Sequence, residues 1–196
     1  MLSAASLIGR KGVIVPGATE HDIIFPAISS AVTPQESNVL AELARGKVVL
    51  EMGAFYGYST IVLASVAKHV TSIDWHMGDD HAGIHDTWEI FQFNIKRYGM
   101  ENRVEAIRER FEDVLPGMAE QGRKFDGCFL DAHHSEESVT RDIGLALPVL
   151  NKGAFFAFHD YGRGEHTGHP GFGVTEAADK FGIVGREGFL GWGFVK

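Results

Sequence analysis

The chain has 196 residues, of which 44% are apolar and 22% charged, a balance typical of a globular domain and not of a disordered or fibrous chain. Its single cysteine, Cys128, excludes a disulfide framework within the chain and fits a reducing compartment. The net charge of −8, with scattered basic residues, argues against a nucleic-acid partner and makes a small molecule the expected ligand.

Neither a targeting segment nor a membrane anchor is predicted. Residues 1–8 are only mildly apolar and are followed by Arg10 and Lys11, flanks that are untypical of a secretory signal. No run of the chain reaches the roughly 20 apolar residues that a membrane-spanning helix needs. We therefore expect a cytoplasmic protein that does not bind membranes.

Two regions differ in their patterning. Residues 1–32 mix glycine, proline and short apolar runs without a sustained period, which predicts an N-terminal arm or cover that could pack on a partner subunit in a homo-oligomer. Residues 33–196 are predicted to form the main domain. It opens with Thr33 as a candidate helix cap and Pro34 in the first turn of a helix that ends at Gly46.

From there, short apolar runs alternate with segments of helical period. The predicted strands are 47–52, 70–74, 104–107, 125–130, 153–158, 183–186 and 192–195. The predicted helices that follow the first one are 59–67, 87–98, 112–121, 136–150 and a last helix that ends near Phe181. This alternation predicts an α/β fold with a doubly wound, mostly parallel sheet, helices on both faces and a C-terminal antiparallel hairpin.

Ligands of such sheets bind at the carboxyl ends of the strands, so the residues after each strand are the first candidates for a site. After the first strand, Gly53 and Gly57 are spaced G-x-x-x-G, which lets the backbone turn tightly and approach a ligand. The dinucleotide fingerprint G-x-G-x-x-G is absent, which argues against a nicotinamide cofactor. Taken alone, the loop is better explained as a tight turn between a strand and a helix.

The residues after the next two strands strengthen the prediction of a ligand site. Asp74 ends the second strand, where a carboxylate can accept hydrogen bonds from both hydroxyls of a ribose. The glycine loop and Asp74 are much less expected to occur together by chance than either feature is to occur alone. After the third strand, Arg110 and Phe111 could flank an adenine, although Phe111 could equally belong to the core.

These residues resemble the class I S-adenosylmethionine-dependent methyltransferases, and within them the small-molecule O-methyltransferases of the catechol and antibiotic-tailoring types. The likeness runs from about residue 33 to the C-terminus and rests on four segments, VVLEMGAFYGYST, TSIDWH, KFDGCFLDAHHS and LNKGAFFAFHDYG. It implies a Rossmann-like sheet with an antiparallel strand near one edge, and S-adenosylmethionine as cofactor. The predicted cofactor-binding residues are Glu51, Gly53, Ala54, Phe55, Tyr56, Gly57, Ser59, Asp74, Trp75, Arg110, Phe111 and Asp131.

A metal site is predicted where the fourth and fifth strands end. Asp131 follows the fourth strand, and His159 with Asp160 follow the fifth, so the three side chains could converge at one edge of the sheet. A cation held there would leave positions open for substrate hydroxyls and would lower the pKa of a bound hydroxyl. The resemblance implies the same position for a divalent metal in the metal-dependent branch of the family.

The histidine at the first of the two fifth-strand positions departs from that branch, whose members often carry oxygen ligands there. An imidazole suits Zn²⁺, Fe²⁺ or Mn²⁺ better than Mg²⁺, so the sequence leaves the identity of the metal open, with Mg²⁺, Mn²⁺ and Zn²⁺ as the candidates. His159 could equally act as a general base, as could His133 and His134. The predicted catalytic residues are His159, His133 and Asp131.

Further histidines follow the second strand, at His76, His81 and His85, with a spacing that matches no zinc motif. A solvated loop is the preferred interpretation, and a lid with Trp75 or Trp88 as an aromatic wall is the alternative. The glycine-rich segment 161–173 is either a flap over the acceptor or plain surface.

The predicted function is therefore S-adenosylmethionine-dependent methyl transfer to a small hydroxylated acceptor, with metal-dependent O-methylation as its finer form. Three alternatives remain: a nicotinamide-dependent oxidoreductase, a histidine-rich metallohydrolase, and a binding protein that keeps the fold without turnover.

Overall fold

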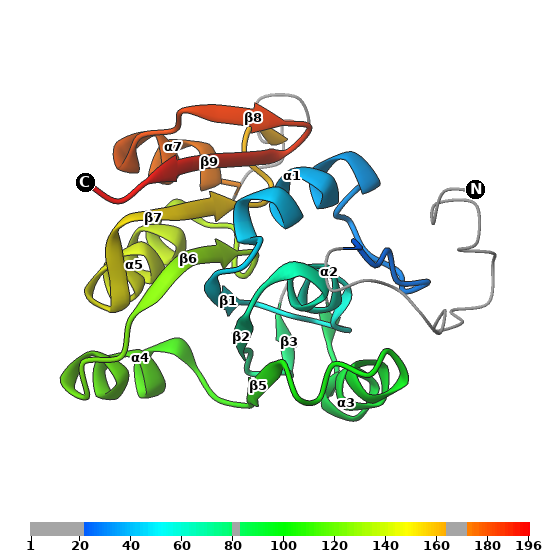
Figure 1. Ribbon diagram of the computed structural model, residues 1–196. Helices are drawn as coiled ribbons and strands as arrows, with labels where there is room; N and C mark the ends of the chain where they lie inside the picture. Colours follow the sequence, from blue (N-terminus) through cyan, green and yellow to red (C-terminus); the bar gives the residue numbers. More distant parts are fainter. Residues whose placement is uncertain (1–21, 80–82, 164–171) are drawn as a thin grey trace.

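Five parallel strands make up most of the main sheet in the computed structural model, which describes residues 22–79, 83–163 and 172–196 (Figure 1). The strands lie in the order β5-β2-β1-β6-β7-β9-β8, and the last two pairings are antiparallel. The predicted sheet and closing hairpin are thus confirmed. The bounds are β1 (Val48–Met52), β2 (His69–Ile73), β5 (Val104–Ile107), β6 (Phe125–Leu130), β7 (Leu150–Phe158), β8 (Gly185–Glu187) and β9 (Leu190–Phe194).

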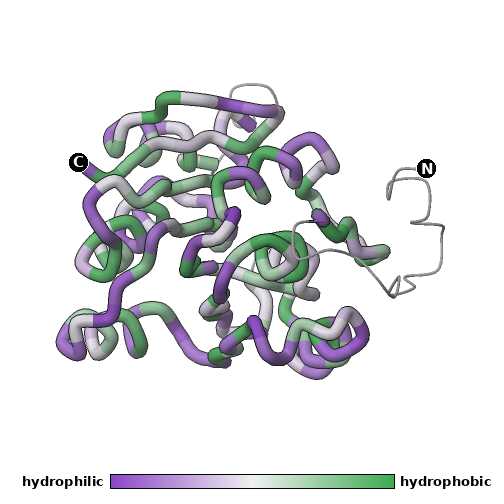
Figure 2. Tube along the Cα trace, in the orientation of Figure 1, coloured by the Kyte–Doolittle hydropathy of each residue, from purple (hydrophilic) through white to green (hydrophobic). Residues whose placement is uncertain are grey.

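Helices cover both faces of this sheet because consecutive strand residues point to opposite sides. Val49 of β1 belongs to the apolar cluster under α1, α2 and α3, whereas Leu50 belongs to the cluster under α4, α5 and α7. Figure 2 shows the apolar residues that run along α2, every residue of which is buried. The helices are α1 (Pro34–Ala44), α2 (Tyr58–Val66), α3 (Trp88–Arg97), α4 (Phe111–Glu120), α5 (Glu136–Ala146) and α7 (Val174–Phe181).

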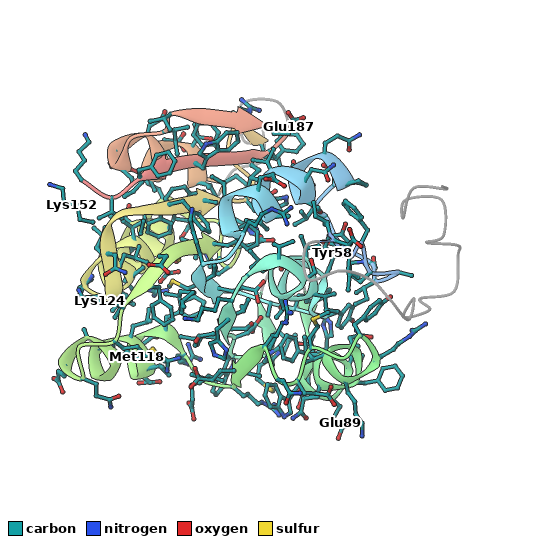
Figure 3. All side chains as sticks on the ribbon, in the orientation of Figure 1. Tyr58, Glu89, Met118, Lys124, Lys152 and Glu187 are labelled. Atoms are coloured by element: carbon teal, nitrogen blue, oxygen red, sulfur yellow. The ribbon has the colours of Figure 1, made fainter. Side chains whose placement is uncertain are left out.

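Most charged side chains lie on the outside of these layers, and the exceptions among the described residues are Glu36, Glu51, Asp142 and Asp160, which are buried. Figure 3 shows Glu89, Lys124, Lys152 and Glu187 at the periphery, whereas Tyr58 lies in the interior. No helix among the described residues is both long enough and apolar enough to cross a membrane.

Two predicted boundaries differ from the structure by three residues or more. The helix predicted over 136–150 ends at Ala146 and continues as a 3₁₀ turn, Leu147–Val149, because Pro148 has no amide hydrogen for the α-helical ladder. β7 consequently begins at Leu150, three residues earlier than predicted. The structure also adds a small ribbon of β3 (Gly78–Asp79) and β4 (Gly83–Ile84), which the sequence pattern did not indicate.

The part of the predicted arm that the structure describes, residues 22–32, contains neither helix nor strand and lies against the α2 and α3 side of the molecule. Ile23, Ile24 and Ile28 pack against the core there. The amide of Ala27 donates to the Tyr98 hydroxyl at 2.8 Å. Residues 1–21 lie outside the described part, so the domain boundary at residue 33 stays a prediction.

The order of the strands in the sheet determines where the site lies. β1 lies between β2, which follows it in the chain, and β6, which comes later, so the connections leave β1 in opposite directions. Such a switch point opens a crevice at the carboxyl ends of the two strands. The loop after β1 and the residues after β2, β6 and β7 all face this crevice.

Candidate active site

A pocket of about 830 Å³ opens at the carboxyl edge of the sheet. Its walls come from the segments that follow β1, β2, β5, β6 and β7, and from residues 29–31 of the N-terminal cover. Most of the residues predicted for the site line it: Gly53, Ala54, Phe55, Tyr56, Ser59, Asp74, Trp75, Arg110, Phe111, Asp131, His133, His159 and Asp160.

The glycine loop is pressed against the segment that follows β6. Gly53 has a φ of 92°, and a Cβ on it would lie 1.9 Å from the backbone oxygen of Asp131. Only glycine fits this approach. Gly57 also has a positive φ, of 88°, and forms the N-cap of α2, where a Cβ would meet the Phe91 ring at 3.1 Å. Gly57 was predicted to contact the cofactor but lies outside the pocket lining.

The carboxylate of Asp74 holds this loop in place. Its Oδ2 accepts hydrogen bonds from the amides of Ala54 at 2.7 Å and Phe55 at 2.9 Å, and its Oδ1 accepts from the amide of His76 at 2.6 Å. Because a carboxylate oxygen has two lone pairs, Oδ2 is already fully used and Oδ1 can accept one further hydrogen bond. The side chain thus joins the ends of β1 and β2 and also lines the pocket.

An aromatic and cationic wall lies beside Asp74. The guanidinium of Arg110 sits 4.7 Å from the centre of the Trp75 ring, and the Trp75 side chain is 42% exposed. Phe111 lines the pocket and also packs against the core. The two positions that the sequence allowed for it, beside a ligand or in the core, therefore each describe part of its environment. A flat adenine ring is the kind of ligand that such a wall accommodates.

Glu51, another predicted cofactor-binding residue, lies below the pocket and does not line it. Its fully buried carboxyl accepts hydrogen bonds from the hydroxyls of Ser59, Thr60 and Ser72 at 2.5–2.6 Å. Burial raises the pKa of Glu51 to about 7, against the lowering effect of these hydroxyls. The residue therefore braces β1, β2 and α2 beneath the loop.

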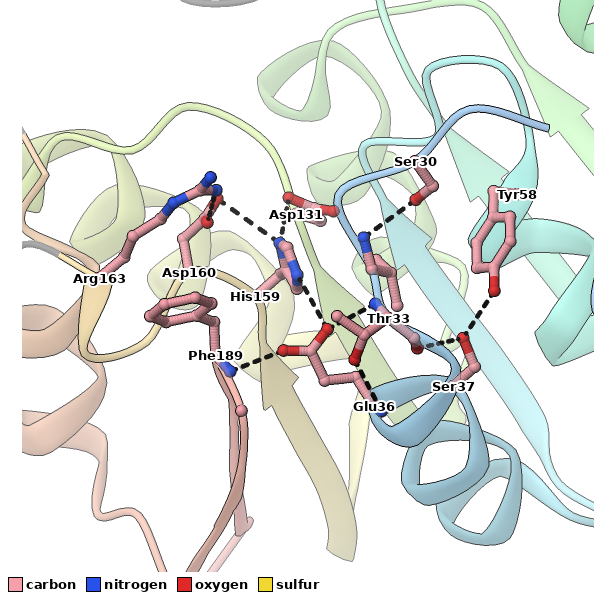
Figure 4. Close-up of polar contacts among 12 residues, drawn as sticks. Ser30, Thr33, Glu36, Ser37, Tyr58, Asp131, His159, Asp160, Arg163 and Phe189 are labelled. Carbon is pink, nitrogen blue, oxygen red and sulfur yellow. Dashed lines mark hydrogen bonds and ion pairs between the residues drawn. The ribbon is translucent and has the colours of Figure 1, made fainter. Parts of the chain in front are cut away.

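Two histidines and two aspartates gather on the opposite side of the pocket. The Nδ1 atom of His159 lies 3.4 Å from Oδ1 of Asp131 and 3.5 Å from Oδ2 of Asp160 (Figure 4). The Nε2 atom of His134 lies 2.8 Å from the same Oδ2 of Asp160. The predicted convergence of the β6 and β7 ends is therefore present, with His134 as an additional member.

The donor atoms of this cluster fit a cation. One ligand atom from each of Asp131, His134 and Asp160 lies within 4.8 Å of the others. Two atoms bound at about 2.1 Å to one ion lie roughly 3.0–3.4 Å apart, close to the separations between His159 and the two carboxylates. Both ring nitrogens of His159 are buried and face carboxylates at 3.4–3.7 Å, beyond the length of an ordinary hydrogen bond.

Carboxylates set the charge of this cluster. Burial by itself would lower the pKa of His159, but the charge and hydrogen bond of Asp131, with Asp160 and Glu36, raise it well above its usual value. Burial alone would likewise raise the pKa of Asp160, yet hydrogen bonds from His134 and His159 and the nearby Arg163 hold it far below its usual range.

Glu36 is a member of this neighbourhood that sequence reasoning missed. Its side chain is fully buried on α1, and Oε2 lies 3.7 Å from Nε2 of His159. Burial would raise its pKa, but hydrogen bonds from His159 and from two backbone amides lower it to about 2. The other unpredicted lining residues include Ser29, Ser30, Ala31, Tyr58, Ser138, Arg141, Arg163 and Phe172.

The remaining predicted histidines take different positions. His133 lines the pocket, and its Nδ1 accepts from the amide of Ser135 at 3.2 Å. His76 is buried against Thr87, and His85 lies 3.1 Å from the Tyr56 hydroxyl. His81 and most of the predicted flap over 161–173 lie outside the described residues.

Comparison with known proteins gives a consistent result. A family model described as "Methyltransferase domain" matches residues 50–161. A catechol O-methyltransferase of Mycobacterium tuberculosis is 31% identical over 167 residues, which cover 82% of this chain and 70% of that protein. A catechol O-methyltransferase of Niastella koreensis is 35% identical over 113 residues and 55% of this chain, and the match spans about half of that relative, 48%.

Solved structures share the fold. The cofactor-bound crystal structure of Rv0187 from MTB has a TM-score of 0.64 and 26% identity, covering 86% of this chain and 81% of that one. An O-methyltransferase from Bacillus cereus in complex with SAH has a TM-score of 0.63 at 22% identity, with 86% and 82% covered. The second likeness concerns the fold alone.

Proposed function

The chain belongs to the class I S-adenosylmethionine-dependent O-methyltransferases, and we propose that it moves a methyl group to a hydroxyl of a small molecule at a divalent metal site. One observation carries the finer part of this proposal. A single pocket joins the glycine loop and Asp74 on one side to the cluster of Asp131, His134, His159 and Asp160 on the other. Cofactor and acceptor can therefore meet inside it.

The cofactor is proposed to lie along the loop after β1. The backbone at Gly53 would face the methionine part, and Oδ1 of Asp74 would accept a hydrogen bond from a ribose hydroxyl. Trp75, Arg110 and Phe111 form the wall proposed for the adenine. Asp131 and Ala132 would close the pocket from the β6 side.

A divalent cation is proposed between Asp131 and Asp160, with an imidazole from His159, as predicted, or from His134. When bound, such a cation supplies Lewis acidity that lowers the pKa of a substrate hydroxyl. A mixed set of oxygen and nitrogen donors favours Mn²⁺ or Zn²⁺ over Mg²⁺.

The chain's own residues are proposed to align the reaction. The acceptor oxygen attacks the methyl carbon while the bond from that carbon to sulfur breaks, leaving S-adenosylhomocysteine as product. The hydroxyl proton goes to a basic group, for which His133, His159 and Asp131 are the candidates in reach of the pocket. Holding the two reactants in line supplies much of the rate, because the sulfonium methyl is already activated.

The test uses a vicinal diol, catechol, as acceptor and measures the release of S-adenosylhomocysteine. We expect the Asp160→Asn variant and chelator-treated wild type to lose turnover, while S-adenosylmethionine affinity by calorimetry stays within about threefold of wild type. Added Mn²⁺ or Zn²⁺ should restore the chelated wild type but not the variant. Full turnover of the chelated enzyme would remove the metal from the proposal and leave the histidines as bases.

Three wider expectations also stay proposals: a catalytic domain over residues 33–196, a covering role for residues 1–32 that includes contact with a second subunit, and a cytoplasmic location.

A further inference from the structure

We infer that Asn94 on α3 is a positioning residue for the glycine loop after β1 (residues 53–57), because its side chain fixes the backbone that carries Phe55 and Tyr56 to the pocket. The inference rests on the proposed place of the cofactor along this loop, and it assigns a role to a residue that does not line the pocket. Its basis is one polar contact in an otherwise apolar interface.

Asn94 is an exception on the inner face of α3. The helix buries three side chains, Phe91, Asn94 and Ile95, and only that of Asn94 is polar. A polar group buried among apolar ones costs free energy unless it forms a hydrogen bond. The Asn94 amide forms one outside its own helix, because Nδ2 donates to the backbone oxygen of Tyr56 at 2.9 Å. The only buried polar side chain of this helix is therefore directed at the loop.

The two apolar neighbours of Asn94 lie against the same loop. A Cβ on Gly57 would lie 3.1 Å from the Phe91 ring and 3.6 Å from the side chain of Ile95. These two side chains thus limit how near the loop can come to α3, at the residue that follows Tyr56. The hydrogen bond from Asn94 adds a direction to this contact, because it sets the orientation of the peptide group between Tyr56 and Gly57.

The loop depends on such contacts because its backbone is strained. The amide of Gly57 donates to the oxygen of Ala54 at 2.7 Å, which closes a turn with Phe55 and Tyr56 at its centre. Phe55 has a φ of 49°, in the left-handed region that is unfavourable for a residue with a bulky side chain. Such a conformation persists only where the surrounding structure holds it.

The contacts that hold this turn come from both of its sides. Asp74 after β2 accepts two backbone amides at the start of the turn, and Asn94 donates to the oxygen of Tyr56 at its end. The Tyr56 hydroxyl lies 3.1 Å from Nε2 of His85, so Tyr56 is held at its backbone and at the end of its ring. Asp74 lines the pocket and can contact a ligand, whereas Asn94 can affect a ligand only through the loop.

A purely structural role for Asn94 makes a different prediction. Leucine has nearly the shape of asparagine and suits the apolar surroundings of Phe91 and Ile95, so Asn94→Leu removes the hydrogen bond and keeps the packing. If Asn94 only fills the interface, this variant should leave cofactor binding as it is. If Asn94 holds the turn, the strained backbone at Phe55 can relax, and the loop should bind the cofactor less tightly.

The experiment measures binding of S-adenosylhomocysteine by calorimetry, with a chelator present so that no metal contributes. We expect Asn94→Leu to raise the Kd by about 3- to 10-fold, which corresponds to the loss of one hydrogen bond. Asn151→Leu is the matched control, because Nδ2 of Asn151 donates to Asp126 at 3.0 Å at the amino ends of β6 and β7, away from the loop. This control should change the Kd by less than about twofold.

Amide hydrogen exchange of the free protein separates this inference from the proposed function. It reports opening of the turn at the amides of Phe55 and Gly57, without cofactor, metal or acceptor. Both amides should exchange faster in Asn94→Leu, by a factor similar to the change in Kd, and at the wild-type rate in Asn151→Leu.

The outcomes of the two measurements are distinct. If wild type binds no S-adenosylhomocysteine, the proposed place of the cofactor fails, and hydrogen exchange still decides the role of Asn94. If Asn94→Leu does not fold, Asn94→Ala takes its place. An unchanged Kd in the Asn94 variant, or exchange at the two amides equal to that of the Asn151 control, would overturn the inference.

Discussion

Two carboxylates hold the glycine-loop side of the pocket in place. Asp74 accepts three backbone amides and thereby joins the ends of β1 and β2, and Glu51 collects three hydroxyls below them. The two residues differ in solvent access: Asp74 lines the pocket, whereas Glu51 is completely buried. A ligand in the pocket can therefore contact Asp74 directly, whereas Glu51 can affect the ligand only through the loop that it supports.

Replacing Asp74 should weaken cofactor binding. We expect Asp74→Ala to reduce the affinity for S-adenosylmethionine by about 1–3 kcal/mol, because hydrogen bonds to a charged acceptor are lost. Calorimetry measures this. Asp126→Asn is a suitable control, since Asp126 also accepts a backbone amide, that of Val48 at 3.1 Å, but at the opposite edge of the sheet. Unchanged affinity in a folded Asp74 variant would contradict the assignment.

Glu51 should make the protein less stable as the pH rises. Its pKa is raised from 4.5 to about 7, so the folded state keeps a proton that the unfolded state has already released. Stability from this group is present below pH 4.5 and falls between pH 4.5 and 7, by about 3 kcal/mol in total. Glu51→Gln should remove this fall.

Urea unfolding from pH 4.5 to 8 compares the two proteins. Asp142, whose pKa burial raises to about 6, is present in both and cancels in the difference. Parallel stability curves of wild type and Glu51→Gln would show that the Glu51 carboxyl titrates normally.

At the scale of elements, close backbone approach determines how the strands and helices meet. Gly127 in β6 is covered by the Phe155 ring of β7, and a Cβ at this position would lie 1.9 Å from that ring. Gly144, in contrast, is exposed on α5 with nothing within 4 Å of its would-be Cβ. The same residue type is therefore required in the strand and merely tolerated in the helix.

These two glycines form a matched pair of predictions. Gly127→Ala should destabilise the protein by about 1–3 kcal/mol through overpacking between β6 and β7. Gly144→Ala should stabilise it by about 0.5–1 kcal/mol, because alanine favours the helix and restricts the unfolded chain. Denaturant unfolding checks both values. Effects of equal sign would show that the contact of Gly127 with Phe155 can relax.

At the scale of the whole molecule, the two packed faces of the sheet meet at the edge where the pocket lies. Two apolar clusters, one on each face, fix the strands, and the pocket lies where the strand order reverses. A ligand that spans this edge contacts segments that follow five different strands, so its binding should stabilise the fold as a unit.

Thermal unfolding measures this coupling. S-adenosylhomocysteine at about 100 times its Kd should add about 2.7 kcal/mol, which corresponds to a Tm increase of roughly 5–10 °C for a chain of this size. NAD at the same concentration should leave the Tm unchanged, because the loop lacks the dinucleotide fingerprint. A rise with NAD alone would favour the oxidoreductase alternative.

Particular elements show how much of the fold could be predicted from the sequence. The alternation of periods predicted each strand of the main sheet and its closing hairpin, since hydrophobic period is a local property that neighbouring residues carry. Thr33 and Pro34 likewise marked the start of α1, and the structure shows the capping box there. The end of the helix at Ala146 was missed because the effect of Pro148 competes with an apolar period that continues beyond it.

The sequence by itself therefore determined the fold class, the family resemblance and the edge of the sheet where the chemistry lies, because side chains at the carboxyl ends of parallel strands must share one edge. Only the tertiary structure decided which of those side chains face the pocket. It left Glu51 and Gly57 outside the pocket lining, added His134 to the acidic cluster and set Glu36 beside His159. These contacts join helices, turns and strands that are far apart in the chain. A local sequence pattern cannot indicate which of these segments lie close together in space.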